Sequence, residues 1–195
     1  MSKFIIRRAK AEDGAALCAI YAPYITDTTI TFEYEVPTDA AFSDRIRETA
    51  AQFPYLVCER DGEIIGYAYA HRIRERAAYD WDAELSVYLK QGTHGRGIGT
   101  VLLACLIELL EMQGLRHLYS CVTMPNPRSV GMQHRLGFED AGVWNTRAGA
   151  LLSKLATRER LVFIAPSCGR TGWYADSPYL KKSRIESFFA RELMP

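Results

Sequence analysis

Two strand-like segments lie only two residues apart in this chain, and that spacing constrains the fold more than any other feature. Residues 55–60 and 63–71 are rich in aromatic and aliphatic side chains, and Asp61-Gly62 between them is typical of a two-residue hairpin turn. Elsewhere, predicted strands alternate with predicted helices. A tight turn makes neighbouring strands antiparallel, whereas a helical crossover allows parallel ones. The pattern therefore predicts a mixed sheet flanked by helices, of the α+β or α/β class.

Hydrophobic periodicity places the other elements. In the helix predicted from residue 38 to about 50, Thr38 is the expected cap and Ala50 is expected on the buried face. In the helix predicted over 98–113, Met112 is expected on the buried face. Residues 161–165 form a weaker strand candidate. Further strands are predicted over 3–8, 82–89, 118–124 and 138–144, and helices over 11–24, from 38 to about 50, over 98–113 and over 127–136.

Composition excludes several classes of protein. The 195 residues include 24 Lys and Arg against 23 Asp and Glu, a net charge of +1, which does not favour a protein that binds nucleic acid. The five cysteines include no C-x-x-C pair, so we expect reduced thiols and no metal site. The first apolar run is too short for a signal peptide or a membrane span. We therefore expect a single domain over residues 1–195, located in the cytoplasm, without nucleic-acid or membrane partners.

A glycine-rich segment between a predicted strand and a predicted helix is the main candidate for a binding site. Gly95, Gly97 and Gly99 surround the expected helix start, where unpaired N–H groups and the positive end of the helix dipole favour an anion. Arg96 adds a charged donor. The spacing matches neither a P-loop nor a dinucleotide fingerprint. The diphosphate of coenzyme A is the remaining nucleotide candidate, and a plain structural loop is the alternative.

Together with residues further along the chain, this segment resembles the GNAT acetyltransferase superfamily. His94-Gly95-Arg96-Gly97-Ile98-Gly99 matches the family signature [QR]-x-x-G-x-[GA] at every position but the first, and Asn126-Pro127-x-Ser129 precedes Leu136-Gly137-Phe138. The chain is most similar to the phosphinothricin and methionine sulfoximine acetyltransferase branch. That similarity rests on Thr31-Phe32-Glu33, Pro54-Tyr55-Leu56-Val57, Gly66-Tyr67-Ala68-Tyr69-Ala70, Arg76-x-Ala78-Tyr79-Asp80-Trp81 and Glu84-x-Ser86-Val87-Tyr88.

The resemblance implies a GNAT sheet that is splayed between its fourth and fifth strands, with the pantetheine of acetyl-CoA in the split. It implies Glu84 as the base, because an acceptor ammonium must lose a proton before it attacks a thioester. A solvated strand residue is the alternative for Glu84, and a helix cap is the alternative for Asn126. The cofactor contacts that the resemblance implies are Val87, Tyr88, Leu89, His94, Gly95, Arg96, Gly97, Ile98, Gly99, Thr100, Asn126 and Ser129.

The acceptor site is also assigned by resemblance. Phe32 and Tyr79 would line it, and Arg76 would bind the carboxylate of an amino-acid-like acceptor. Gln133 departs from the family pattern, in which Tyr or His stands at this position, and its amide has no proton to give to a leaving thiolate. From about residue 148 the chain departs from the branch, and only a weak match to the last strand of the branch occurs, near 172–176.

The sequence thus predicts an N-acetyltransferase that moves the acetyl group of acetyl-CoA to a small amine. Phosphinothricin and methionine sulfoximine or sulfone are the leading acceptors, and direct attack is expected because no cysteine lies at a family nucleophile position. Two alternatives stay open: the same chemistry on a polyamine, an aminoglycoside or a protein N-terminus, and a catalytically weak acyl-CoA-binding module. The branch also implies a homodimer.

Overall fold

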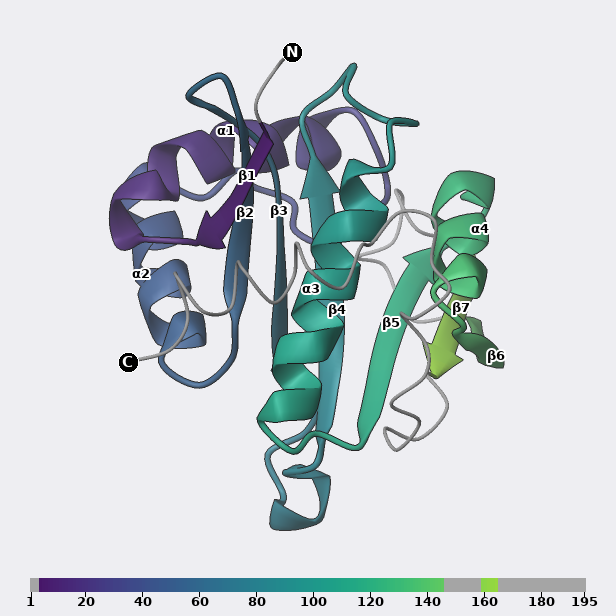
Figure 1. Cartoon of the computed structure of the whole chain (residues 1–195). Helices are drawn as coiled ribbons and strands as arrows, with labels where there is room; N and C mark the ends of the chain where they lie inside the picture. The colour runs from purple at the N-terminus through teal and green to yellow at the C-terminus, as the bar shows by residue number, and fades with distance from the viewer. Residues whose placement is uncertain (1–3, 146–158, 165–195) are drawn as a thin grey trace.

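The computed structural model describes residues 4–145 and 159–164, and its strands form one seven-stranded sheet (Figure 1). The order is β1-β2-β3-β4-β5-β7-β6. β4 and β5 are parallel, and the other neighbours in the sheet are antiparallel, which confirms the mixed sheet. The strands are β1 Phe4–Arg8, β2 Tyr55–Arg60, β3 Glu63–Arg72, β4 Asp82–Leu89, β5 His117–Thr123, β6 Glu139–Asn145 and β7 Glu159–Ile164.

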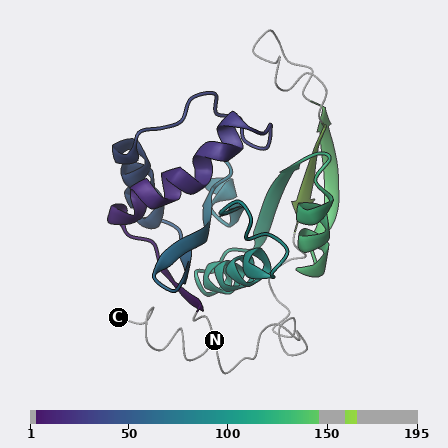
Figure 2. The ribbon, with the colours of Figure 1, turned by 90° about the horizontal axis from the view of Figure 1, so that it is seen from above.

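Helices cover both faces of this sheet (Figure 2). α1 and α2 pack against one face with an aromatic core, and α3 packs against the other with an aliphatic core. Successive residues of a strand point to opposite faces, so Tyr88 joins the first core and Val87 and Leu89 join the second. The helices are η1 Ala11–Asp13, α1 Gly14–Thr26, α2 Asp39–Ala50, η2 Ala77–Tyr79, α3 Ile98–Met112 and α4 Pro127–Arg135.

Local sequence signals account for several of these boundaries. Asp61 and Gly62 have φ angles of 52° and 87°, the left-handed pair that a tight hairpin between β2 and β3 requires. The Thr38 hydroxyl accepts a hydrogen bond from the Ala41 N–H at 3.2 Å and caps α2, as predicted. α4 begins with Pro127, which suits a first helical position because its missing N–H would have no helical partner there.

Two predictions about individual residues needed correction, and one weaker strand prediction was confirmed. Met112 is 66% exposed, because the buried stripe of α3 runs through Leu106 and Leu110 and a position two residues further on lies about 200° round the helix. Ala50 is likewise exposed, at the last turn of α2. The segment 159–164 does form a strand, but β7 lies between β5 and β6 in the sheet. The last strand expected near 172–176 falls outside the described residues.

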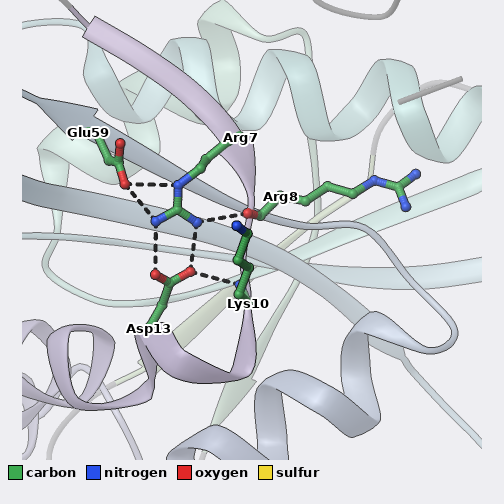
Figure 3. A network of polar contacts seen from close by, with 5 residues as sticks. All are labelled: Arg7, Arg8, Lys10, Asp13 and Glu59. Carbon is green, nitrogen blue, oxygen red and sulfur yellow. Dashed lines mark hydrogen bonds and ion pairs between the residues drawn. The ribbon is translucent and has the colours of Figure 1, made fainter. Parts of the chain in front are cut away.

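An ion-pair network ties the start of the chain to the sheet (Figure 3). The Arg7 guanidinium donates to both carboxylate oxygens of Asp13, at 2.7 and 2.8 Å, and to Glu59 Oε1, at 2.6 and 2.8 Å. The Lys10 N–H also donates to Asp13, at 2.7 Å. Burial alone would raise the pKa of the Asp13 carboxyl, but these hydrogen bonds outweigh it and the pKa lies below its usual value.

Asp13→Asn should therefore lower the free energy of unfolding by about 1–2 kcal/mol at neutral pH. Because the folded-state pKa of Asp13 is depressed, its stabilising effect is present above the unfolded pKa of about 3.9 and is lost as the pH falls through the folded value. Urea denaturation of both proteins should show a difference at neutral pH that shrinks in acid. A difference of constant size across that range would contradict the assignment.

Candidate active site

The sheet opens between β4 and β5. The two strands pair from Asp82–His117 to Leu85–Ser120, and the pairing stops there. Beyond this point, over residues 86–89 of β4 and 121–123 of β5, the ribbons of the two strands diverge (Figure 1). The splay expected between the fourth and fifth strands is therefore confirmed.

Along β4, every second residue directs its backbone N–H and C=O groups toward this split. The Lys90 N–H donates to the Ile65 carbonyl of β3 at 2.9 Å, and hydrogen-bonding direction alternates along an antiparallel pair. Val87 and Leu89 therefore direct their backbone groups to the β5 side. The Leu89 N–H already donates to the Tyr24 hydroxyl at 3.2 Å, a partner that the sequence did not reveal. Val87 is the better placed of the two for a ligand in the split.

Glycine conformation shapes the mouth of the split. Gly92, Gly95 and Gly97 have φ angles of 80°, 80° and 79°, a region that side chains strongly disfavour. Gly97 is the N-cap residue of α3, and it offers no side chain to the first N–H groups of the helix. A Cβ at Gly95 or Gly97 would meet nothing within 4 Å, so the helix start is open to an incoming anion.

The other loop residues assigned to the cofactor differ in accessibility. Arg96 is exposed and Thr100 is half-buried in the first turn of α3. Ile98 is buried in the α3 core, and Gly99 allows close packing because a Cβ there would lie 3.1 Å from the Met132 sulfur. Tyr88 packs its ring into the aromatic core. The side chains of Ile98 and Tyr88 are therefore structural, and the backbone groups of Tyr88 face β3, away from the split.

Glu84 lies at the closed end of the split. It is half-buried on the sheet face opposite α3. In the register it stands beside His71 of β3 and Tyr119 of β5, one position before the pairing of β4 and β5 ends. Among the described residues, no hydrogen bond or ion pair engages its carboxylate. A carboxylate in this position is free to accept a proton from a ligand or from a water molecule.

The three residues expected at the acceptor site lie on two connections. Phe32 is 42% exposed in the connection between α1 and α2. Arg76 and Tyr79 lie in the connection between β3 and β4, where the Arg74 guanidinium stacks 5.6 Å from the centre of the Tyr79 ring. Burial, then Asp82 and Tyr79, raise the pKa of the Tyr119 hydroxyl, so Tyr79 lies within electrostatic reach of the strand position beside Glu84.

A pocket of about 590 Å³ lies near the open end of the split, between the residues that follow α1 and those that precede α4. The Thr123 hydroxyl, at the end of β5, donates to the Ile30 carbonyl at 3.2 Å and so joins β5 to the segment that follows α1. Asn126 caps α4 by accepting the Ser129 N–H at 3.1 Å, so the capping role of Asn126 is confirmed. The pocket is lined by Thr26, Asp27, Thr28, Thr29, Ile30, Pro125, Asn126, Pro127 and Arg128.

Gln133 is a structural side chain. It is only 2% exposed, and its amide donates to the Ser120 hydroxyl at 2.8 Å. It links α4 to β5 and lies in the core. An amide has no proton to transfer at neutral pH, so Gln133 cannot act as an acid for a leaving group.

Residues 4–145 and 159–164 contain neither a metal-binding cluster nor a membrane-spanning helix. There, no group of three or more His, Cys, Asp and Glu side chains is arranged to hold a metal ion. None of the described helices is long and apolar enough to cross a membrane.

A sheet split beside an uncapped, glycine-rich helix start, with a carboxylate at the closed end, is the arrangement expected of an acetyltransferase. Residues 6–146 match the family described as acetyltransferase (GNAT) domain, so the chain belongs to the GNAT acetyltransferase family. This membership confirms the fold class and the enzyme class expected from the sequence.

Two related enzymes and one solved structure are similar to this chain. Phosphinothricin N-acetyltransferase of Alcaligenes faecalis is 39% identical over 140 residues, 71% of each chain. The L-methionine sulfoximine/L-methionine sulfone acetyltransferase of Pseudomonas aeruginosa is 34% identical over 140 residues, 70% of this chain and 81% of its own. The crystal structure of a GNAT superfamily phosphinothricin acetyltransferase from Sinorhizobium meliloti, in complex with AcCoA, has a TM-score of 0.77 and 27% identity, and the match covers 91% of this chain and 99% of that one.

Proposed function

We propose that the protein transfers the acetyl group of acetyl-CoA to the amine of a small amino-acid-like acceptor, of the phosphinothricin or methionine sulfoximine type. The observation that best supports this is the split itself, with Glu84 at its closed end and the bare helix start of α3 at its mouth. Two relatives at 34% identity or more are named for such acceptors. The homodimer and the cytoplasmic location expected from the sequence stay predictions.

The residues at the mouth of the split fit acetyl-CoA, which supplies the acetyl thioester. Arg96 and the N–H groups that follow Gly97 form a positive site for the diphosphate. Gly95 and Gly97 leave room for it, since neither position would bring a Cβ near other atoms. His94, Thr100, Asn126 and Ser129 are further candidates for cofactor contacts at this end.

Glu84 would start the reaction by taking a proton from the acceptor ammonium, directly or through water. The amine nitrogen then attacks the thioester carbonyl and the new C–N bond forms. As the C–S bond breaks, the positively charged nitrogen loses its second proton to water, which leaves a neutral amide. The Val87 N–H would stabilise the negative charge that develops on the carbonyl oxygen. The sulfur leaves as a thiolate, whose pKa of about 8.5 makes it a fair leaving group without an acid. A buried Gln133 is compatible with this scheme.

Arg76 is the best candidate to bind the acceptor carboxylate. Two nearby arginines are engaged, because Arg72 at the end of β3 pairs with Asp80 and Arg74 stacks on Tyr79. Arg76 is exposed and takes part in none of the ion pairs found among the described residues. A positive group on the connection that precedes β4 favours an acceptor with a carboxylate over a polyamine or an aminoglycoside.

The proposal is tested by thiol release from acetyl-CoA with a panel of acceptors: phosphinothricin, methionine sulfoximine, methionine sulfone, spermidine, an aminoglycoside and a peptide. We expect release with the first three, and Arg76→Gln should raise their KM about tenfold or more. Arg47→Gln, on the outer face of α2, is the matched control. Release only with the cationic acceptors or the peptide would replace the proposed substrate class. Binding of acetyl-CoA without release for any acceptor would favour the acyl-CoA-binding module.

A further inference from the structure

The Tyr24 hydroxyl meets three groups at the mouth of the split. It lies 2.7 Å from the Leu89 carbonyl, 3.2 Å from the Leu89 nitrogen and 3.1 Å from His94 Nε2. Tyr24 is in the last turn of α1 and only 7% exposed. One buried hydroxyl thus joins the end of β4 to the first residue of the glycine-rich signature.

The donors and acceptors of this contact can be assigned. Burial raises the pKa of the Tyr24 hydroxyl, which keeps its proton and donates it to the Leu89 carbonyl. Its two lone pairs then accept the Leu89 N–H and a hydrogen from His94 Nε2. His94 must therefore carry its hydrogen on Nε2. Burial and then the charge of Arg128 lower the pKa of His94, which favours the neutral ring.

The loop between these two contacts has few other restraints. The Thr93 N–H and hydroxyl both bond to the Lys90 carbonyl, at 3.1 and 2.6 Å, and close one turn. Gly92 lies in this loop, and Gly95 and Gly97 follow His94; none of the three has a side chain to hold the backbone. Glycine loses more conformational freedom on ordering than any other residue. Without a contact that joins Leu89 to His94, ligand binding would have to order this loop.

We propose that Tyr24 is a positioning residue for acetyl-CoA, whose hydroxyl holds Leu89 and His94 together and so pre-forms the loop that binds the diphosphate. The inference rests on the proposed function, because it concerns the affinity for that donor. In this arrangement the Leu89 N–H stays bonded to the Tyr24 hydroxyl. Of Val87 and Leu89, only Val87 can then offer its backbone N–H to the ligand. Pre-ordering a loop raises affinity by lowering the entropy that binding costs.

Tyr21 provides a matched control one turn earlier in α1. Both rings pack edge-on against Tyr88, with centroid distances of 4.9 Å for Tyr21 and 5.1 Å for Tyr24. The Tyr21 hydroxyl instead contacts Thr31 and Glu33, away from the glycine-rich segment. Tyr→Phe at either position keeps the ring and removes one hydroxyl. A purely packing role would make the two substitutions equivalent.

Calorimetric titration of the full chain with acetyl-CoA is the test, and it requires no acceptor. Tyr24→Phe should weaken binding about tenfold, while Tyr21→Phe should stay within about twofold of the wild type. Thermal unfolding of both variants measures any general loss of structure. Equal affinities for the two variants would overturn the inference. Failure of the wild-type chain to bind acetyl-CoA would instead overturn the proposed function.

Variants of His94 test the same contact without touching the core. His94→Gln keeps an N–H donor for Tyr24 and should lose less affinity for acetyl-CoA than His94→Leu, which should lose about as much as Tyr24→Phe. Since both changes break one contact, the double variant Tyr24→Phe with His94→Leu should be no weaker than the poorer single variant. Multiplicative losses, or equal losses for His94→Gln and His94→Leu, would refute a coupled role.

Discussion

Glu84→Gln should lower kcat for acetyl transfer by about 10²–10⁴-fold and leave the affinity for acetyl-CoA unchanged. The amide keeps the size of the carboxylate but cannot accept a proton from an ammonium. Glu84 stands beside Tyr119 where the pairing of β4 and β5 ends, so its loss should affect the acceptor amine and leave the mouth of the split intact. Initial rates at saturating acetyl-CoA, together with calorimetric affinities, measure both effects.

The pH dependence separates a base from a structural carboxylate. As the pH rises, more of the acceptor is already an unprotonated amine and has less need of a base. The deficit of Glu84→Gln should therefore shrink toward high pH. Glu48→Gln, an exposed carboxylate of α2, is the control and should keep full activity at every pH. A deficit that is the same at all pH values would argue against proton transfer to Glu84.

Gly97→Val is expected to weaken acetyl-CoA binding on the order of 100-fold, since two charge-assisted hydrogen bonds of about 1.5 kcal/mol each are lost. Gly97 is the N-cap residue of α3 and has a φ of 79°, a backbone conformation in which a branched side chain is strained. The new side chain would also stand over the first N–H groups of α3, in space that is open in the structure. Calorimetric titration with acetyl-CoA measures the loss.

Gly62→Val is a control for backbone strain. Gly62 has a φ of 87° in the turn between β2 and β3, and a Cβ there would also meet nothing within 4 Å. Both variants should lose similar stability in thermal unfolding, because both force a branched residue into the left-handed region. Only Gly97→Val should lose affinity. A comparable loss of affinity in Gly62→Val would show that strain, and not the helix start, explains the effect.

Local patterns allowed much of the fold to be predicted. The Asp61-Gly62 turn, the cap at Thr38 and the alternating segment 82–89 each determine a structure within a few residues of themselves. The glycine-rich segment also identified the start of α3, where Gly97 offers no side chain to the first N–H groups. The two exposed residues expected to be buried, Ala50 and Met112, both lie in the last turn of a helix, and Met112 lies about 200° round the helix from the buried Leu110.

The candidate site was predicted less completely. The role of Glu84 came from a family resemblance, and its neighbours His71 and Tyr119 could not be inferred because strand register is not visible in one strand alone. Tyr24 was only the expected last residue of its helix. Its hydroxyl contacts a strand 65 residues further along the chain, so only the packing of α1 against β4 reveals its partners.

The sequence by itself determined which segments become strands, helices and turns, and where a bare helix start would attract an anion. These properties depend on neighbouring residues, through backbone sterics, hydrogen bonding and hydrophobic period. Only the tertiary structure decided that β7 lies between β5 and β6, that β4 and β5 part after Leu85, and that Tyr24 meets Leu89 and His94. Such contacts join segments far apart in the chain, and the packing of the whole sheet selects among the many pairings that local patterns allow.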